Sequence, residues 1–185
     1  MNSTMPATDL PPPKVIARVA AGNCLFMAAG HASESLDRFA SWFLAAFGAG
    51  LALSVSHLKE VSTLIPLPRV ELAAYLFLVA TILCVVQRYI AMVVTTGAKA
   101  AKDGREMGEK LKDMDVEEFL AQMLLGLPWP VRHMSIKQFS ALSKGDFAAG
   151  GRMFMRLTMW QGALVGFELI LLLVALTKIV NEIGA

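Results

Sequence analysis

The sequence predicts an all-α membrane protein with three transmembrane helices and a helical cytoplasmic segment between the second and the third. Three long apolar runs, near residues 39–58, 71–94 and 160–180, carry this prediction. Each is long enough for a helix to cross a hydrocarbon core of roughly 30 Å at about 1.5 Å per residue. The composition agrees, because 56% of the 185 residues are hydrophobic and 17% are charged, against about 25% charged in soluble domains.

Composition and motifs exclude several classes of function. The net charge of +2 gives no basic surface for nucleic acid. The two cysteines and three histidines are scattered without the spacing of a metal site, so we expect no metal, no cofactor and no disulfide framework. No nucleophile, phosphate-binding or zinc-protease motif occurs in the sequence. We therefore do not expect an enzyme.

The chain before the first span divides into two parts. Residues 1–14 contain three consecutive prolines and lack the pattern of a secretory signal, and we expect a disordered cytoplasmic tail. Residues 15–34 are apolar but interrupted by Arg18 and Asn23, which makes them a poor span. We expect a short amphipathic or interfacial helix there, with a fourth span as the alternative.

Residues 35–96 are expected to form a transmembrane hairpin. The run 39–58 holds no formally charged residue and has Trp42 near its start, as is typical of the headgroup zone. Two prolines in the connection end the helical structure, and the second span follows over 71–94. Arg88 lies inside this second span, and we expect its long side chain to reach the nearer membrane interface. This interface is then expected to be the cytoplasmic one.

Residues 97–156 are expected to form the helical cytoplasmic segment. Its first part is densely charged, with opposite charges four positions apart, which favours a solvated continuation of the second helix. A further helix is predicted where an aspartate cap is followed three residues later by a glutamate and then by apolar residues. Its apolar face, with Phe119, Leu120 and Met123, is the predicted binding site for a cytoplasmic protein partner.

The uneven distribution of basic residues predicts the orientation. Ten lysines and arginines lie between positions 95 and 156, whereas the turn over 59–69 has two. Basic loops stay in the cytoplasm, so we expect the N-terminus inside and the C-terminus outside, in a plasma or inner membrane.

Residues 157–185 are expected to form the third transmembrane helix, as the end of one long helix that starts near Asp146. Gly162 and Gly166 have the four-residue spacing that lets helices approach closely. At roughly 100° per residue, Gly166 points about 200° away from Glu168. The glycine pair therefore predicts a homo-oligomer formed on the helix face opposite the glutamate.

Glu168 is the acidic residue that the sequence places deepest in the bilayer. It lies about eight residues into the third span, hence on the order of 12 Å below the interface and near the midplane. A charge there costs a few kcal/mol, so the group should be protonated, paired or facing water. Three hypotheses remain open. In the first, Glu168 has a structural role and fixes helix packing, either by pairing with Arg88 or by accepting hydrogen bonds from Gln87 and Gln161. In the second it belongs to an ion or proton pathway, and in the third it is exposed at the membrane interface.

These features favour a non-catalytic integral membrane protein in the lipid bilayer. We expect an accessory, regulatory or scaffold subunit that binds a protein partner through its cytoplasmic helices. The alternative is a small oligomeric channel, or a proton- or ion-coupled transporter subunit, that uses Glu168.

Overall fold

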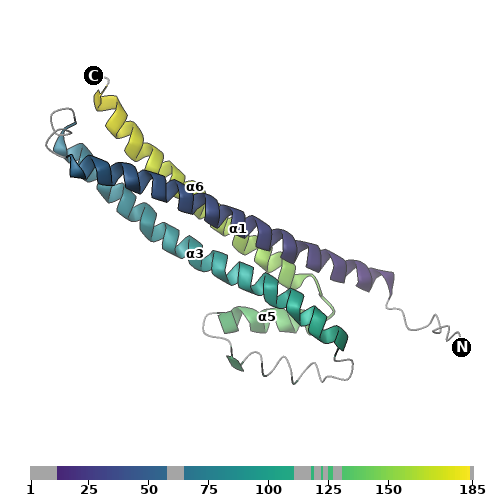
Figure 1. Ribbon diagram of the computed structural model, residues 1–185. Helices are drawn as coiled ribbons and strands as arrows, with labels where there is room; N and C mark the ends of the chain where they lie inside the picture. The colour runs from purple at the N-terminus through teal and green to yellow at the C-terminus, as the bar shows by residue number, and fades with distance from the viewer. Residues whose placement is uncertain are drawn as a thin grey trace, which may run out of the picture. The chain divides into compact units, whose positions relative to one another are not determined.

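The computed structural model describes most of the chain. The described residues are 12–57, 65–110, 118, 122, 125–126 and 131–183. Within these residues the protein is all helical and contains no strand. Four helices have defined bounds: α1 (Pro13–Ser56), α3 (Leu67–Lys110), α5 (Val131–Ser143) and α6 (Ala149–Ile183) (Figure 1).

Three of these helices, α1, α3 and α6, are long and apolar enough to cross a membrane. For the described residues, this confirms the predicted all-helical class and the predicted number of helices that are long and apolar enough to span a membrane. α1 and α3 have 44 residues each and α6 has 35, which corresponds to lengths of about 66 Å and about 52 Å. Each helix is therefore much longer than a hydrocarbon core of about 30 Å.

Helix α1 differs from the prediction in its first half. Residues 15–34 do not form a separate short helix but belong to one helix that runs from Pro13 to Ser56. The sequence contains no proline between these two ends, and a glycine inside a helix costs only about 1 kcal/mol relative to alanine. Pro13 stands at the first helical position, where the missing N–H costs nothing.

The helical continuation of the second span is confirmed, because α3 extends to Lys110. The helix predicted after it is described at only four positions, 118, 122, 125 and 126. Its predicted partner-binding residues, Phe119, Leu120 and Met123, lie outside the described residues.

The chain packs as two units, and each of the three long helices contributes to both. Unit 1 contains the described residues up to Ala29 and those from Ala98 to Met155, and unit 2 contains Gly30–Gly97 and the described residues from Arg156 onward. Two of the unit boundaries lie beside the predicted ends of the cytoplasmic segment, at 97 and 156. The location of that segment in the cytoplasm stays a prediction.

In unit 1, the first half of α1 packs against the start of α6 with almost no space between the backbones. A Cβ atom added to Gly151 would lie 2.5 Å from the carbonyl oxygen of Gly22. One added to Gly22 would lie 2.6 Å from the carbonyl oxygen of Phe147. The rings of Phe26 and Phe154 are in contact beside this crossing, with centroids 5.0 Å apart. Glycine at both crossing positions therefore permits the contact.

The turn between α5 and α6 also belongs to unit 1. Gly145 has a φ of 81°, in the left-handed region that favours glycine after a helix end. The Asp146 N–H then donates to the carbonyl of Ala141 at 2.9 Å, and the Asp146 carboxylate pairs with Arg152 in the first turn of α6. α6 begins at Ala149, close to the predicted start near Asp146.

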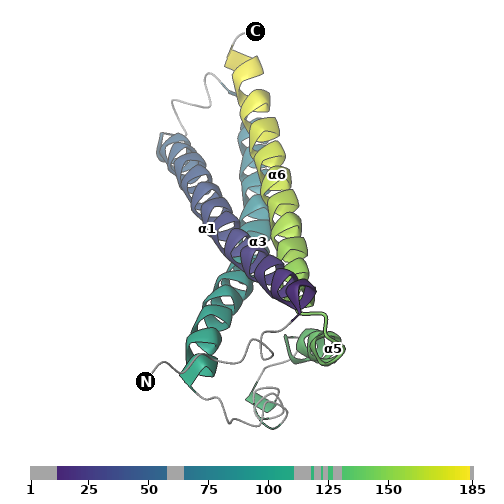
Figure 2. The same ribbon diagram turned by 90° about the vertical axis from the view of Figure 1, so that its right-hand side faces the viewer.

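In unit 2, α1 and α6 run in the same direction and α3 runs in the opposite one (Figure 1, Figure 2). Buried positions recur every three and four residues on these helices, the spacing of a coiled-coil seam. We call these positions the core seam: Ser33 and Ala40 on α1; Ala73, Ala80, Cys84, Gln87, Ala91 and Val94 on α3; Thr158, Gln161, Val165, Glu168, Leu172 and Ala175 on α6. Many members are small, which lets the helices approach closely.

Candidate functional site

Polar side chains occupy several positions of the core seam. The buried polar members are Ser33, Gln87, Thr158, Gln161 and Glu168. A buried polar group without a hydrogen bond costs several kcal/mol in an apolar environment. The partners of these side chains therefore decide which of them serve packing and which are left for another role.

Ser33 and Gln161 satisfy each other across α1 and α6. The Ser33 hydroxyl donates to Gln161 Oε1 at 2.6 Å, and Gln161 Nε2 donates to the Ser33 carbonyl at 3.0 Å. Both residues are fully buried. The two bonds fix the axial position of α1 relative to α6. Gln161 was one of the two predicted hydrogen-bond donors to Glu168, but its amide is taken by Ser33.

Sequence reasoning missed Ser33 because it stands before the predicted start of the first span. The available signal was its spacing of seven residues from Ala40, which places both residues on one face of a supercoiled helix.

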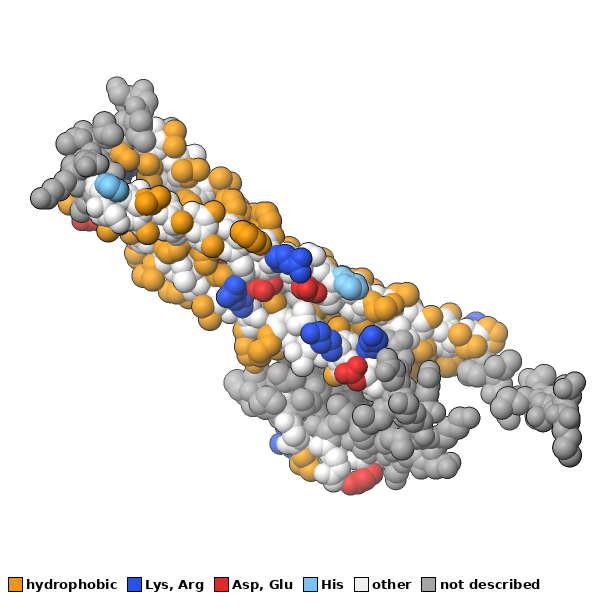
Figure 3. Space-filling view, in the orientation of Figure 1, with side chains coloured by type: hydrophobic (Ala, Val, Ile, Leu, Met, Phe, Trp, Pro, Cys, Tyr) orange, Lys and Arg blue, Asp and Glu red, His pale blue; other side chains and the backbone are white. Residues whose placement is uncertain are grey.

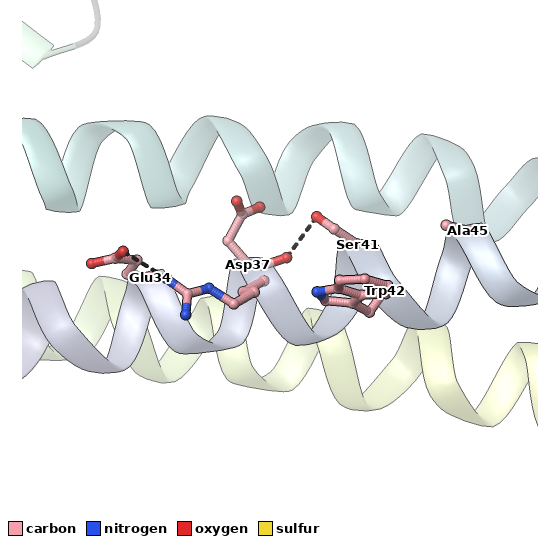
Figure 4. A pocket seen from close by; sticks show the side chains of 6 residues that line it. Glu34, Asp37, Ser41, Trp42 and Ala45 are labelled. Atoms are coloured by element: carbon pink, nitrogen blue, oxygen red, sulfur yellow. Dashed lines mark hydrogen bonds and ion pairs between the residues drawn. The ribbon is translucent and has the colours of Figure 1, made fainter.

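Arg88 pairs with α1 and not with Glu168. Its Nε lies 3.5 Å from Asp37 Oδ1, and its Nη2 donates to Ser41 Oγ at 2.5 Å. Ser41 Oγ in turn donates to the Asp37 carbonyl at 2.7 Å. Figure 4 shows the Asp37 carboxylate and the Ser41 hydroxyl on the side of α1 that faces α3. The alternative in which Glu168 pairs with Arg88 is therefore not found, because the guanidinium contacts Asp37 and Ser41 of α1.

A shallow depression lies on the surface of α1 beside this ion pair. Its volume is about 390 Å³, and it is lined by Glu34, Asp37, Arg38, Ser41, Trp42 and Ala45 (Figure 4). Glu34 and Arg38 form an exposed ion pair at 3.1 Å, and Trp42 is 72% exposed. Figure 3 shows acidic and basic side chains side by side on this stretch, with apolar side chains further along the helix. Charged groups beside an exposed tryptophan are typical of a membrane interface.

Glu168 Oε1 and both polar atoms of the Gln87 side chain are buried without a hydrogen-bond partner among the described residues. Glu168 is 3% exposed, and its Oε1 accepts no hydrogen bond from a described residue. Gln87 is fully buried, and within the described part of the chain neither its Oε1 nor its Nε2 has a partner. Of the two groups expected to satisfy Glu168 besides Arg88, Gln161 is engaged elsewhere and Gln87 is itself unsatisfied.

The helix register places Gln87 and Glu168 at one level of unit 2. Glu168 lines a crevice together with Ala40 of α1. On α3, the residue after Gln87 is Arg88, which contacts positions 37 and 41 on either side of Ala40. Both buried residues therefore lie within about one helical turn of Ala40 along the bundle.

The surroundings of Glu168 contain charges but no described partner for its Oε1. Asp37 lies within electrostatic range of Glu168, and Cys84 lies within range of Glu168, Asp37 and Arg88. The crevice beside Glu168 is otherwise lined by Phe43, Val165, Leu169 and Leu172 in addition to Ala40, and it is too narrow for a water molecule. On this side the carboxyl group therefore faces apolar side chains and no space for water.

The same register revises the depth of Glu168 relative to the first span. The predicted span begins at position 39, and Glu168 is level with Ala40. Gln161 is level with Ser33, so the predicted starts of the first and third spans are offset along the bundle. Relative to α1, Glu168 lies near the end that carries Asp37, and not in the middle of the span.

The two glycines of the predicted packing pair have different surroundings. A Cβ added to Gly162 would lie 3.7 Å from Leu36 Cδ1, an ordinary contact within the chain. One added to Gly166 would have no described atom within 4 Å. Gly162 therefore already faces α1, whereas Gly166 is open. The predicted homo-oligomer stays a prediction.

The arrangement can hold a buried neutral acid and can fix helix register. Among the described residues, no group of three or more His, Cys, Asp or Glu side chains is placed to hold a metal ion. Comparisons of the chain with family models, with curated proteins and with solved structures gave no match.

Proposed function

We propose that this protein is a non-catalytic integral membrane protein that acts as an accessory, regulatory or scaffold subunit for a protein partner. The supporting observation is that only a small share of the apolar helix stretches is buried within the chain. In their most apolar stretches, α1, α3 and α6 are only 6%, 28% and 22% buried. α1 in particular has the smallest buried share, so much of its apolar stretch is open to lipid or to another protein.

The surface of α1 supports a protein partner in addition to lipid. Its depression combines the Glu34–Arg38 ion pair with the exposed Trp42. Aromatic residues and arginine are enriched at protein interfaces, and charged groups fix the orientation of a partner. On the cytoplasmic side, the sequence supports a second contact through Phe119, Leu120 and Met123.

The proposal includes an orientation, with the N-terminus and the segment 97–156 in the cytoplasm and the C-terminus outside. It rests on the ten basic residues between positions 95 and 156. The membrane is a plasma or inner membrane.

Pull-down from native membranes tests the proposed partner. Chemical cross-linking followed by mass spectrometry identifies the proteins bound to the wild-type chain and to a variant with Phe119, Leu120 and Met123 changed to serine. We expect the variant to lose its principal partner. A matched control is Ile136→Ser, which removes an exposed apolar side chain from α5 and should leave the partner bound. Identical partners for all three proteins contradict the cytoplasmic contact.

The second candidate function is a small oligomeric channel or a proton- or ion-coupled transporter subunit. The observation that favours it is the buried, unpartnered Oε1 of Glu168 at the level of the likewise unpartnered Gln87, because ionisable groups within membrane spans mark transport pathways. Flux measured in liposomes tests it. Glu168→Gln should abolish proton or ion flux, and equal flux from wild type and variant rules out this candidate.

A further inference from the structure

We propose that Glu168 and Gln87 form a proton-binding site in unit 2, in which Glu168 is held as the neutral acid and hydrogen-bonds to the Gln87 amide. The ligand is a proton, and the site does not depend on whether the protein transports anything. Three unpartnered polar atoms at one level of the core seam carry the inference: Glu168 Oε1, Gln87 Oε1 and Gln87 Nε2.

The hydrogen-bonding capacity of the two side chains fits the protonated acid only. A carboxylate accepts hydrogen bonds but donates none, whereas an amide needs a donor for its oxygen and an acceptor for its nitrogen. If Glu168 is ionised, the amide oxygen of Gln87 stays without a donor. If Glu168 is protonated, its O–H donates to Gln87 Oε1 and its carbonyl oxygen accepts from Gln87 Nε2. This pairing satisfies all three atoms.

The size of the site selects a proton over a metal ion. The crevice beside Glu168 does not admit a water molecule, so a hydrated cation cannot reach the carboxyl group through it. A bare Ca²⁺ ion requires six to eight oxygen ligands and Mg²⁺ requires six, and no metal-binding cluster is found in the part of the chain that the structure describes. A proton needs one acceptor and no additional volume.

The charged and titratable groups that face Glu168 from the neighbouring helices do not stabilise a carboxylate there. From α1, Asp37 brings a second negative charge within electrostatic range. From α3, Arg88 is engaged by Asp37 and Ser41 and is half exposed, and Cys84 is an uncharged thiol in the core seam. Ionised Glu168 would therefore be a buried carboxylate within electrostatic range of a like charge. The neutral acid avoids both the cost of burying a charge and the repulsion from Asp37.

Infrared spectroscopy of the full-length protein in lipid vesicles tests the site, because a protonated carboxyl group has a carbonyl stretch well separated from that of a carboxylate. At neutral pH we expect a protonated-carboxyl band in the wild type and its loss in Glu168→Gln. In Gln87→Leu the band should remain but shift to higher frequency, since the acid has lost its hydrogen-bond partner. Glu71→Gln, which changes an exposed glutamate of α3, should leave the band unchanged.

Two further measurements keep the test decisive if a variant fails to fold. In the wild type grown with isotope-labelled glutamate, the band should move to lower frequency, and it should disappear reversibly at strongly alkaline pH. The proposal is overturned if no protonated-carboxyl band depends on Glu168 or on the glutamate label at neutral pH. It is also overturned if addition of Na⁺, K⁺ or Ca²⁺ at constant pH removes the band, because the ligand is then a metal cation. Loss of flux in liposomes without a change in this band would bear on transport alone.

Discussion

At Gln161, a single amide joins two helices through both of its polar groups. It accepts from the Ser33 hydroxyl and donates to the Ser33 carbonyl, and both residues are fully buried. Arg88 is the contrasting case, because its ion pair with Asp37 is half exposed. Exposed ion pairs contribute about 0–1 kcal/mol, whereas a buried acceptor left unpaired costs about 1–3 kcal/mol. The neutral pair therefore contributes more to stability than the charged one.

Ser33→Ala tests this ranking. It leaves Gln161 Oε1 buried without its donor, and we expect a loss of roughly 1 kcal/mol in the free energy of unfolding in micelles, in keeping with interhelical hydrogen bonds in membranes of about 0.6–1.7 kcal/mol. Ser54→Ala is the matched control, since the Ser54 hydroxyl donates to the Gly50 carbonyl of its own helix and to no other described residue. Equal effects of the two substitutions would show that the Ser33 contact adds nothing.

At the scale of the helices, the closeness of packing depends on where small residues stand. Gly22 of α1 and Gly151 of α6 meet backbone to backbone in unit 1. Gly104 of α3 has no described atom near the position of its missing Cβ. The same substitution, glycine to alanine, should therefore have opposite effects at the two kinds of position.

Gly151→Ala should destabilise the protein by about 1–3 kcal/mol, because its Cβ would overlap the Gly22 carbonyl and force the helices apart. Gly104→Ala should stabilise it by up to about 1 kcal/mol through helix propensity alone. Thermal unfolding followed by circular dichroism measures both. Stabilisation by Gly151→Ala would refute the close crossing of α1 and α6.

Gly166 gives a separate test of self-association on α6. Gly166→Leu meets no described atom of its own chain, so the monomer should keep its stability. If a second copy packs against this position, the bulky side chain prevents close approach, and cross-linked dimers in native membranes should fall several-fold. Gly50→Leu, at another open glycine, is the control. An unchanged dimer fraction in Gly166→Leu means that this face does not mediate oligomerisation.

At the scale of the whole molecule, the orientation can be read with single thiols. Cys24 is exposed and Cys84 is buried. A membrane-impermeant thiol reagent should therefore label the wild type only after the cells are permeabilised. In a Cys24→Ser background, Ala185→Cys should be labelled in intact cells. Labelling of Cys24 in intact cells would reverse the proposed orientation.

The sequence by itself determined the class of the protein and the number of its long apolar helices. Apolar runs of about 20 residues have one stable form in a bilayer, since only a helix satisfies its backbone internally. Length and composition are local properties and are therefore readable without a structure. The boundaries were less accurate: the helix expected to end near residue 34 continues through Ser35, because no strong helix breaker stands there.

Only the tertiary structure decided which polar side chains meet. The sequence singled out Glu168, Arg88, Gln87 and Gln161, but partner choice depends on the register of three helices, and an axial shift of one or two turns changes every pair. The register is set by small seam residues and by Ser33, which apolarity does not reveal. That register directs Arg88 to Asp37 and Gln161 to Ser33, and it leaves Glu168 Oε1 and the Gln87 amide without hydrogen-bond partners among the described residues.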